Sequence, residues 1–181
     1  DNRRSRGLGD VYKRQISDKI HFFPNLLNVG DFPFLEKNYK TDKLNLGYIG
    51  RISPEKNILK MINAVSILID KGKEIHFSIY GDGRDSDYIE SVNKLILSKN
   101  LSRNVKLMGQ TNKVVEAYKE IDLIILISDY EGFSNVIAEA LTSGLPIITS
   151  AIPENEYLVS DSINGFTVNH KDVLSIVNGI E

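Results

Sequence analysis

Short apolar runs alternate with longer amphipathic segments along most of this chain. The apolar runs predict strands at residues 44–49, 74–80, 104–108, 122–127, 146–149 and 165–168. Helical periodicity between the runs predicts helices at residues 54–71, 85–99, 112–120, 134–144 and 153–159, with a further helix from Lys171 onward. Because strands and helices alternate, we expect an α/β fold with a parallel sheet and helices on both of its faces.

The most informative polar residues follow the expected strand at residues 122–127. This run is unbroken and apolar, which is typical of a parallel strand covered on both faces. At Ser128 the chain becomes polar, and Glu131 lies in the glycine-containing loop that follows. The next helix is expected to begin near Ser134 or Asn135, which are both good N-cap residues. The carboxyl end of such a strand, next to a helix N-terminus, favours an anionic ligand.

Glu139 is a single charge inside an otherwise apolar helical segment. The segment is otherwise typical of a buried helix, where a carboxylate is costly unless it is hydrogen-bonded. Helical spacing puts Asn135, Thr142 and Ser143 near it, and these residues could satisfy it without a ligand. Alternatively, its two oxygens could accept hydrogen bonds from the neighbouring hydroxyls of a sugar or ribose. Glu131, taken alone, is equally well explained as an ordinary loop carboxylate.

A second polar group occupies GYIGRISPEKNILK, residues 47–60. Gly50 and Arg51 end the expected strand, and Ser53 is the expected N-cap of a helix that begins with Pro54. Arg51 and Lys56 therefore lie near a helix N-terminus, where cations oppose the helix dipole. An anion between them would explain both, because arginine and lysine are good phosphate ligands. Solvated surface cations are the alternative for each residue alone.

Taken together, GRISPEKN and EGFSNVIAEAL resemble the nucleotide-sugar-binding half of the retaining glycosyltransferases of the GT-B type. The resemblance is to family 4 in particular, within glycosyl transferases group 1, with its Gly-Arg…Glu-Lys turn and its Glu-x7-Glu pattern, here Glu131 and Glu139. It covers the chain from about Lys43 onward, including YGDG at residues 80–83 and the run at 105–109. It implies a Rossmann-like sheet that forms the C-terminal half of a GT-B two-domain architecture.

The resemblance also implies a role for each matched residue. Arg51 and Lys56 would hold the donor diphosphate, Glu139 the ribose hydroxyls and Glu131 the hydroxyls of the transferred sugar. Arg51, Lys56 and Glu131 are thus the implied catalytic residues. The remaining implied donor-binding residues are Gly50, Gly81, Gly83, Met108, Gly109, Gly132, Phe133, Ser134, Asn135 and Val136. Among these, residues 133–136 would bind the distal phosphate through N–H groups, Gly81 and Gly83 would allow close approach of the nucleotide, and residues 107–109 would meet the base.

The implied reaction moves a sugar from a UDP- or GDP-sugar to a polysaccharide or glycolipid, with retention and without a cofactor or a metal. Negative charge builds up on the departing diphosphate, so Arg51, Lys56 and the helix N-terminus would stabilise the transition state in place of a metal. Two alternatives remain open. One is a nucleotide-sugar epimerase of the same architecture, against which the Gly-Arg…Glu-Lys turn argues. The other is a non-catalytic nucleotide-sugar-binding module.

Other site signals in the sequence are weak. Residues 81–86 faintly resemble a dinucleotide-binding fingerprint, but a serine replaces the third glycine and the next strand does not end in an acid. Asp85 and Asp87 spell a metal-binding Asp-x-Asp pattern, yet acids are favoured at the helix start expected there. There is no cysteine, and the histidines are isolated in sequence, so a zinc site has no support.

Domain organisation follows from composition. Residues 1–15 are basic and aperiodic, and we expect a non-native leader there. Residues 16–40, with a Pro-Asn pair ending at Asn25, resemble the family's interdomain linker, so residues 41–181 would be a donor-binding domain truncated at its C-terminus. An N-terminal acceptor-binding domain would be missing, and the chain alone is then expected not to transfer sugar.

A net charge of −2 gives no reason to expect nucleic acid as a partner. A cytoplasmic location is expected, with the parent protein peripherally associated with the inner face of the membrane.

Overall fold

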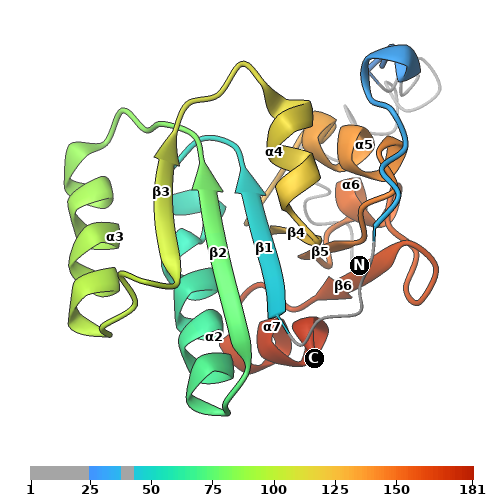
Figure 1. Cartoon of the computed structure of the whole chain (residues 1–181). Coiled ribbons are helices and arrows are strands. Elements are labelled where there is room, and N and C mark those ends of the chain that lie inside the picture. Colours follow the sequence, from blue (N-terminus) through green and yellow to red (C-terminus); the bar gives the residue numbers. More distant parts are fainter. Residues whose placement is uncertain (1–24, 38–42) are drawn as a thin grey trace, which may run out of the picture.

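The computed structural model describes residues 25–37 and 43–181, which contain a single parallel sheet of six strands in the order β3-β2-β1-β4-β5-β6. The strands are β1 (Lys43–Ile49), β2 (Glu74–Tyr80), β3 (Val105–Gly109), β4 (Leu123–Leu126), β5 (Ile147–Ser150) and β6 (Gly165–Val168). Figure 1 shows that β1, β2 and β3 point to the same edge. All six expected strands are confirmed, and the parallel α/β architecture is Rossmann-like, as predicted.

The helices follow the strands in chain order. The α-helices are α2 (Ile58–Asp70), α3 (Ser86–Ser98), α4 (Val114–Glu120), α5 (Asn135–Thr142), α6 (Pro153–Glu156) and α7 (Val173–Ile180), and short 3₁₀ turns are η1 (Val29–Asp31) and η2 (Pro54–Lys56). Helix α2 lies behind the strands in Figure 1 and contacts both α3 and α7. After β3 the chain returns to form β4 on the other side of β1, so right-handed crossovers place α4 and α5 on the opposite face of the sheet from α2 and α3.

The hydrophobic core lies between the sheet and the helices on its two faces. Its residues are most completely buried at the centre of the sheet. Every residue of β4 and of β5 is buried, and for β4 this confirms the interpretation of the unbroken apolar run at residues 122–127. Tyr48 on β1 and Phe77 on β2 are also fully buried. The central strands are therefore held rigidly, and their carboxyl ends form a fixed base for the loops that follow.

The single helix expected at residues 54–71 is wrong. The chain instead forms η2, and then α2 begins after Asn57, which has a left-handed backbone (φ 50°). Ser53 does occupy the N-cap position of η2, but its hydroxyl donates to Glu55 Oε1 at 2.7 Å and caps no backbone N–H. The break turns Lys56 away from a continuous helix and fixes it in a tight turn. Helix α6 is also shorter than the predicted 153–159.

Residues 25–37 lie along α4 and α5. The Leu35 N–H donates to the Ser143 carbonyl at 2.9 Å, and Lys37 Nζ donates to the Tyr118 carbonyl at 3.0 Å. Asn25 Nδ2 donates to Asn135 Oδ1 at 2.8 Å, at the start of α5. The predicted leader at residues 1–15 and most of the predicted Pro-Asn element lie outside the described residues. The assignment of the linker and of the domain boundaries stays a prediction.

Candidate functional site

The strand order reverses between β1 and β4, and the crevice outside their carboxyl ends is where open α/β sheets bind ligands. Turn η2 follows β1, and the loop at residues 127–134 follows β4, so both predicted polar groups meet at this crevice. Two sequence segments about 75 residues apart are thereby brought together, as the contact of Lys56 with Glu131 shows.

Lys56 and Glu131 form an ion pair across the crevice. Lys56 Nζ lies 2.7 Å from Glu131 Oε1, and the side chains are only 18% and 12% exposed. The Ser128 hydroxyl donates to the same carboxylate oxygen at 2.6 Å. Glu131 Oε2 has no hydrogen bond to the part of the chain that the structure describes, and the Lys56 ammonium keeps two further N–H donors. The anion expected beside Lys56 is, in this structure, a carboxylate of the chain itself.

Further contacts fasten the loop that carries Glu131 to turn η2. The Asp129 N–H donates to the Glu55 carbonyl at 2.9 Å, and Asn57 Nδ2 donates to Asp129 Oδ1 at 2.8 Å. Sequence reasoning missed Asn57 and Asp129. Asparagine adopts the left-handed conformation more readily than most residues. An asparagine directly after Lys56 was therefore a signal that the chain could turn there.

Helix α5 begins at the crevice as predicted. Ser134 is its N-cap, and its hydroxyl accepts from the Ile137 N–H at 3.4 Å. Asn135 is the first residue of the helix, and its side chain is bonded to Asn25. The first turn of α5, with its backbone N–H groups, therefore follows shortly after Glu131 and Gly132. It lies at the ligand-binding edge of the sheet.

Glu139, on α5, is half-buried and accepts a hydrogen bond from the Tyr118 hydroxyl of α4 at 3.1 Å. Burial raises the pKa of Glu139, and the Tyr118 hydrogen bond partly opposes this rise in pKa. None of the three residues that could have satisfied the carboxylate locally does so. Thr142 donates to the Ala138 carbonyl, the Ser143 hydroxyl is buried without a partner among the described residues, and Asn135 is bonded to Asn25.

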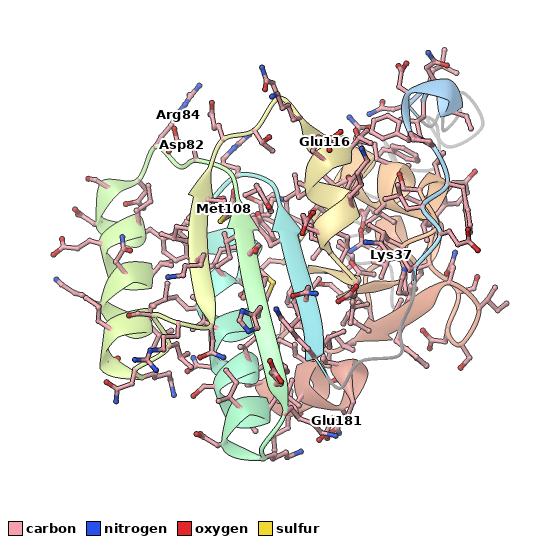
Figure 2. All side chains as sticks on the ribbon, in the orientation of Figure 1. Lys37, Asp82, Arg84, Met108, Glu116 and Glu181 are labelled. Carbon is pink, nitrogen blue, oxygen red and sulfur yellow. The ribbon has the colours of Figure 1, made fainter. Side chains whose placement is uncertain are left out.

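A cleft of about 860 Å³ lies beside this crevice, at the carboxyl ends of β1 and β2. It is lined by Ile49, Gly50, Arg51, Tyr80, Gly81, Asp82, Gly83, Arg84, Gln110, Thr111 and Asn112. Of the predicted residues it gathers Gly50, Arg51, Gly81 and Gly83, while Lys56, Glu131 and Glu139 are not part of its lining. Met108 and Gly109 are exposed at the end of β3, next to this lining. Figure 2 shows Asp82 and Arg84 pointing outward from the loop after β2.

The glycines of the cleft are required by packing of the chain against itself. A Cβ atom at Gly81 would overlap the Gly50 carbonyl oxygen, and one at Gly83 would overlap the Ile52 carbonyl oxygen. The loop after β2 runs along the loop after β1, and the Ile52 N–H donates to the Asp82 carbonyl at 2.8 Å. A close approach of ligand to Gly81 and Gly83 stays a prediction. Sequence reasoning did not assign Arg84, Gln110, Thr111 or Asn112 to a site. Their position after β2 and β3 was the available signal, because polar residues at the ends of parallel strands often bind ligands.

The Asp-x-Asp signal is explained by local structure. Asp85 is the N-cap of α3 and accepts from the Tyr88 N–H at 2.9 Å, as the helix-start interpretation predicts. Within residues 25–37 and 43–181, no group of three or more His, Cys, Asp or Glu side chains is arranged to hold a metal ion. His76 lies on β2, and His170 Nε2 is 3.8 Å from Asp129 Oδ1. No helix among these residues has both the length and the apolar character needed to cross a membrane.

Comparison with known proteins gives the family. The model of the family described as glycosyl transferases group 1 matches residues 33–181. The chain belongs to this family. The fold agrees with that assignment, because it matches solved GT-B glycosyltransferase structures.

Two curated relatives and one solved structure illustrate the likeness. The chain is 27% identical over 172 residues to a poly(ribitol-phosphate) α-N-acetylglucosaminyltransferase of Staphylococcus aureus, covering 94% of this chain and 34% of the relative. It is 33% identical over 170 residues to the GtfA subunit of a UDP-N-acetylglucosamine–peptide N-acetylglucosaminyltransferase of Streptococcus agalactiae, covering 91% of this chain and 32% of that protein. A structure of a mutant of S. aureus TarM in complex with Fondaparinux, α-GlcNAc-glycerol and UDP is similar with a TM-score of 0.72 at 25% identity, covering 94% of this chain and 34% of TarM. The chain thus spans about a third of the length of these relatives.

Proposed function

We propose that this chain is the donor-binding part of a glycosyltransferase that uses a nucleotide-diphosphate sugar. The observation that carries the proposal is the Lys56–Glu131 pair at 2.7 Å. It joins the two segments that carry the family resemblance, and it lies at the switch point of the sheet, beside the start of α5. A basic group, a carboxylate and a helix N-terminus at one crevice fit a ligand that carries both phosphates and hydroxyls.

In this proposal the diphosphate is bound by Arg51, Lys56 and the N-terminal turn of α5. Arg51 is exposed at the edge of the cleft, so its guanidinium is free to approach phosphate oxygens, and Lys56 retains two N–H donors beyond its bond to Glu131. As the sugar–phosphate bond breaks, negative charge grows on the leaving diphosphate. Fixed positive groups aimed at it lower the barrier without a metal or another cofactor.

The two carboxylates would bind the hydroxyls of the donor. Glu139 has one oxygen bonded to Tyr118, and its other oxygen accepts no hydrogen bond from the described residues, which leaves it available to the ribose. Glu131 likewise has Oε2 available to hydroxyls of the transferred sugar. A role for Glu131 in hydrogen bonding is sufficient, and no covalent intermediate on it is proposed.

The finer assignments rest on the relatives. UDP is favoured as the nucleotide, because the TarM structure contains UDP and the GtfA relative is named for a UDP-sugar. These relatives are named for a polymer acceptor and a peptide acceptor. A surface polysaccharide or glycolipid is our proposed acceptor, with retention of configuration as in family 4. We further propose that acceptor contacts lie outside this chain, and that the chain alone binds donor without transferring sugar.

Replacing Glu139 with glutamine tests the ribose assignment. We expect Glu139→Gln to weaken uridine and UDP equally, by about 1.5 kcal/mol each, because one charged acceptor of a shared ribose is lost. Isothermal titration calorimetry with both ligands measures this. Glu116→Gln is the matched control, since Glu116 is an exposed carboxylate on α4 that pairs with Lys119. Unchanged uridine affinity in Glu139→Gln would remove Glu139 from the proposed site.

A further inference from the structure

Tyr118 is a buried phenol that the sequence analysis did not assign to the site. It lies on α4, its side chain has no solvent exposure, and its hydroxyl reaches Glu139 Oε2 at 3.1 Å. The same hydroxyl is 3.5 Å from the Val136 carbonyl, in the first turn of α5. A polar atom at the end of a buried ring thus faces the start of α5 and its carboxylate.

Among the described residues, only the Tyr118 hydroxyl donates a hydrogen bond to the Glu139 carboxylate. Burial, together with the nearby Glu139 charge, raises the pKa of Tyr118, so the phenol stays neutral and remains a donor at physiological pH. Among the described residues, Tyr118 is the titratable group that faces the Glu139 carboxylate. On the same helix, Lys119 pairs with Glu116 at the exposed surface.

Tyr118 is itself held on two sides. The Phe32 ring packs against its ring, with centroids 6.5 Å apart and planes inclined at 55°. Lys37 Nζ donates to its carbonyl at 3.0 Å. Since the ring is packed and the helix end is bonded, the hydroxyl has little freedom to move away from Glu139.

We propose that Tyr118 is a positioning residue that holds the Glu139 carboxylate toward the ribose of the bound nucleotide. This inference rests on the proposed function, because it assumes that Glu139 binds ribose. The hydroxyl occupies one carboxylate oxygen and restricts the orientation of the group, so that the second oxygen stays available to the ribose. Loss of the hydroxyl frees the Glu139 side chain to adopt other rotamers and leaves a half-buried carboxylate without its donor.

The test is Tyr118→Phe, with binding of uridine and of inorganic pyrophosphate measured by calorimetry between pH 5 and pH 8.5. We expect uridine to bind about threefold to tenfold more weakly at neutral pH, the range of one hydrogen bond, and pyrophosphate to bind as in the unsubstituted chain. Protonation of Glu139 removes a charged acceptor, so uridine affinity falls as the pH is lowered. Without the hydroxyl this fall should begin at a higher pH, because the group that favours the ionised form is gone. A purely structural role would not move that midpoint.

Two controls separate the outcomes. Tyr88→Phe removes a half-buried phenol hydroxyl from α3 and should change neither the uridine affinity nor its pH midpoint. Tyr118→Phe combined with Glu139→Gln should bind uridine no more weakly than Glu139→Gln alone. If Glu139→Gln weakens uridine but Tyr118→Phe neither weakens it nor moves the midpoint, the positioning role is refuted and the proposed function stands. If Glu139→Gln has no effect, the ribose assignment itself fails. Equal loss of uridine and pyrophosphate in Tyr118→Phe would indicate general unfolding and also overturn the positioning role.

Discussion

Replacing Lys56 with alanine is expected to weaken UDP binding by about 1.5 to 3 kcal/mol, which is the range for a hydrogen bond to a charged group. The diphosphate loses one of its two basic side chains, and Glu131 is left as a nearly buried carboxylate without its 2.7 Å partner. Uridine carries no phosphate, so its affinity should be unchanged. Calorimetric titration of the variant with UDP and then with uridine measures both quantities.

Lys60→Ala is the matched control for this prediction. Lys60 is one turn further along the same segment, on α2, and its Nζ donates to the His170 carbonyl at 3.0 Å. The substitution removes the same positive charge four residues away without removing the partner of Glu131, so UDP affinity should change little. Equal losses of UDP and uridine affinity in Lys56→Ala would contradict the division of the donor between Lys56 and Glu139.

Gly81→Ala is expected to lower the free energy of unfolding by about 3 to 5 kcal/mol. The new methyl group would overlap the Gly50 carbonyl oxygen, and the backbone there has φ of 146°, a conformation that alanine rarely adopts. Both the overlap and the strain fall on backbone in the cleft at the carboxyl ends of β1 and β2, where the loop after β2 packs against the loop after β1. Urea unfolding followed by far-UV circular dichroism measures the change.

Two other glycines calibrate this effect. Gly72 has φ of 86° with no atom within 4 Å of a built Cβ, so Gly72→Ala should cost only about 1 to 2 kcal/mol from backbone strain. Gly132 has neither a left-handed φ nor a close neighbour, and Gly132→Ala should leave stability within about 0.5 kcal/mol. A Gly81→Ala variant as stable as Gly132→Ala would show that the loops after β1 and β2 do not pack as described.

The strands could be predicted from the sequence because of how parallel sheets bury their residues. Each central strand is covered on both faces, so it appears as an apolar run with polar or glycine residues at its ends. The β4 run has that pattern, and its boundaries differ from the structure by one residue at each end. The N-cap at Ser134 was predictable for a similar reason, since capping depends on the local sequence alone.

Long-range partners of the site residues were beyond sequence reasoning. Nothing local marks Tyr118 as the donor to Glu139, because the contact depends on how α4 and α5 pack on the sheet. Nor does the sequence reveal that Lys56 is bonded to Glu131, although both residues were singled out. The sequence pattern predicted that Lys56 and Glu131 lie at the same edge of the sheet. Which side chains contact one another there depends on tertiary packing.

The break at Asn57 was missed because local propensity favours one continuous helix over residues 54–71. The structure places a left-handed residue there, whose side chain donates to Asp129 of the neighbouring loop. Tertiary contacts thus override local helix propensity at Asn57. The resulting turn places Lys56 at the crevice. Gly81 is a comparable case, since its requirement comes from the Gly50 carbonyl and not from its own neighbours in sequence.

The most direct test of the central claim is the set of backbone amide chemical shifts of the ¹⁵N-labelled chain during titration with UDP in the presence of EDTA. The account predicts saturable changes concentrated at Gly50, Arg51 and Lys56 after β1, and at residues 134–139 in the first turns of α5. Because the proposed site binds the diphosphate without a metal, adding Mg²⁺ should leave the pattern and the affinity unchanged. An absence of changes, changes confined to other parts of the chain, or binding that appears only with Mg²⁺ would contradict it.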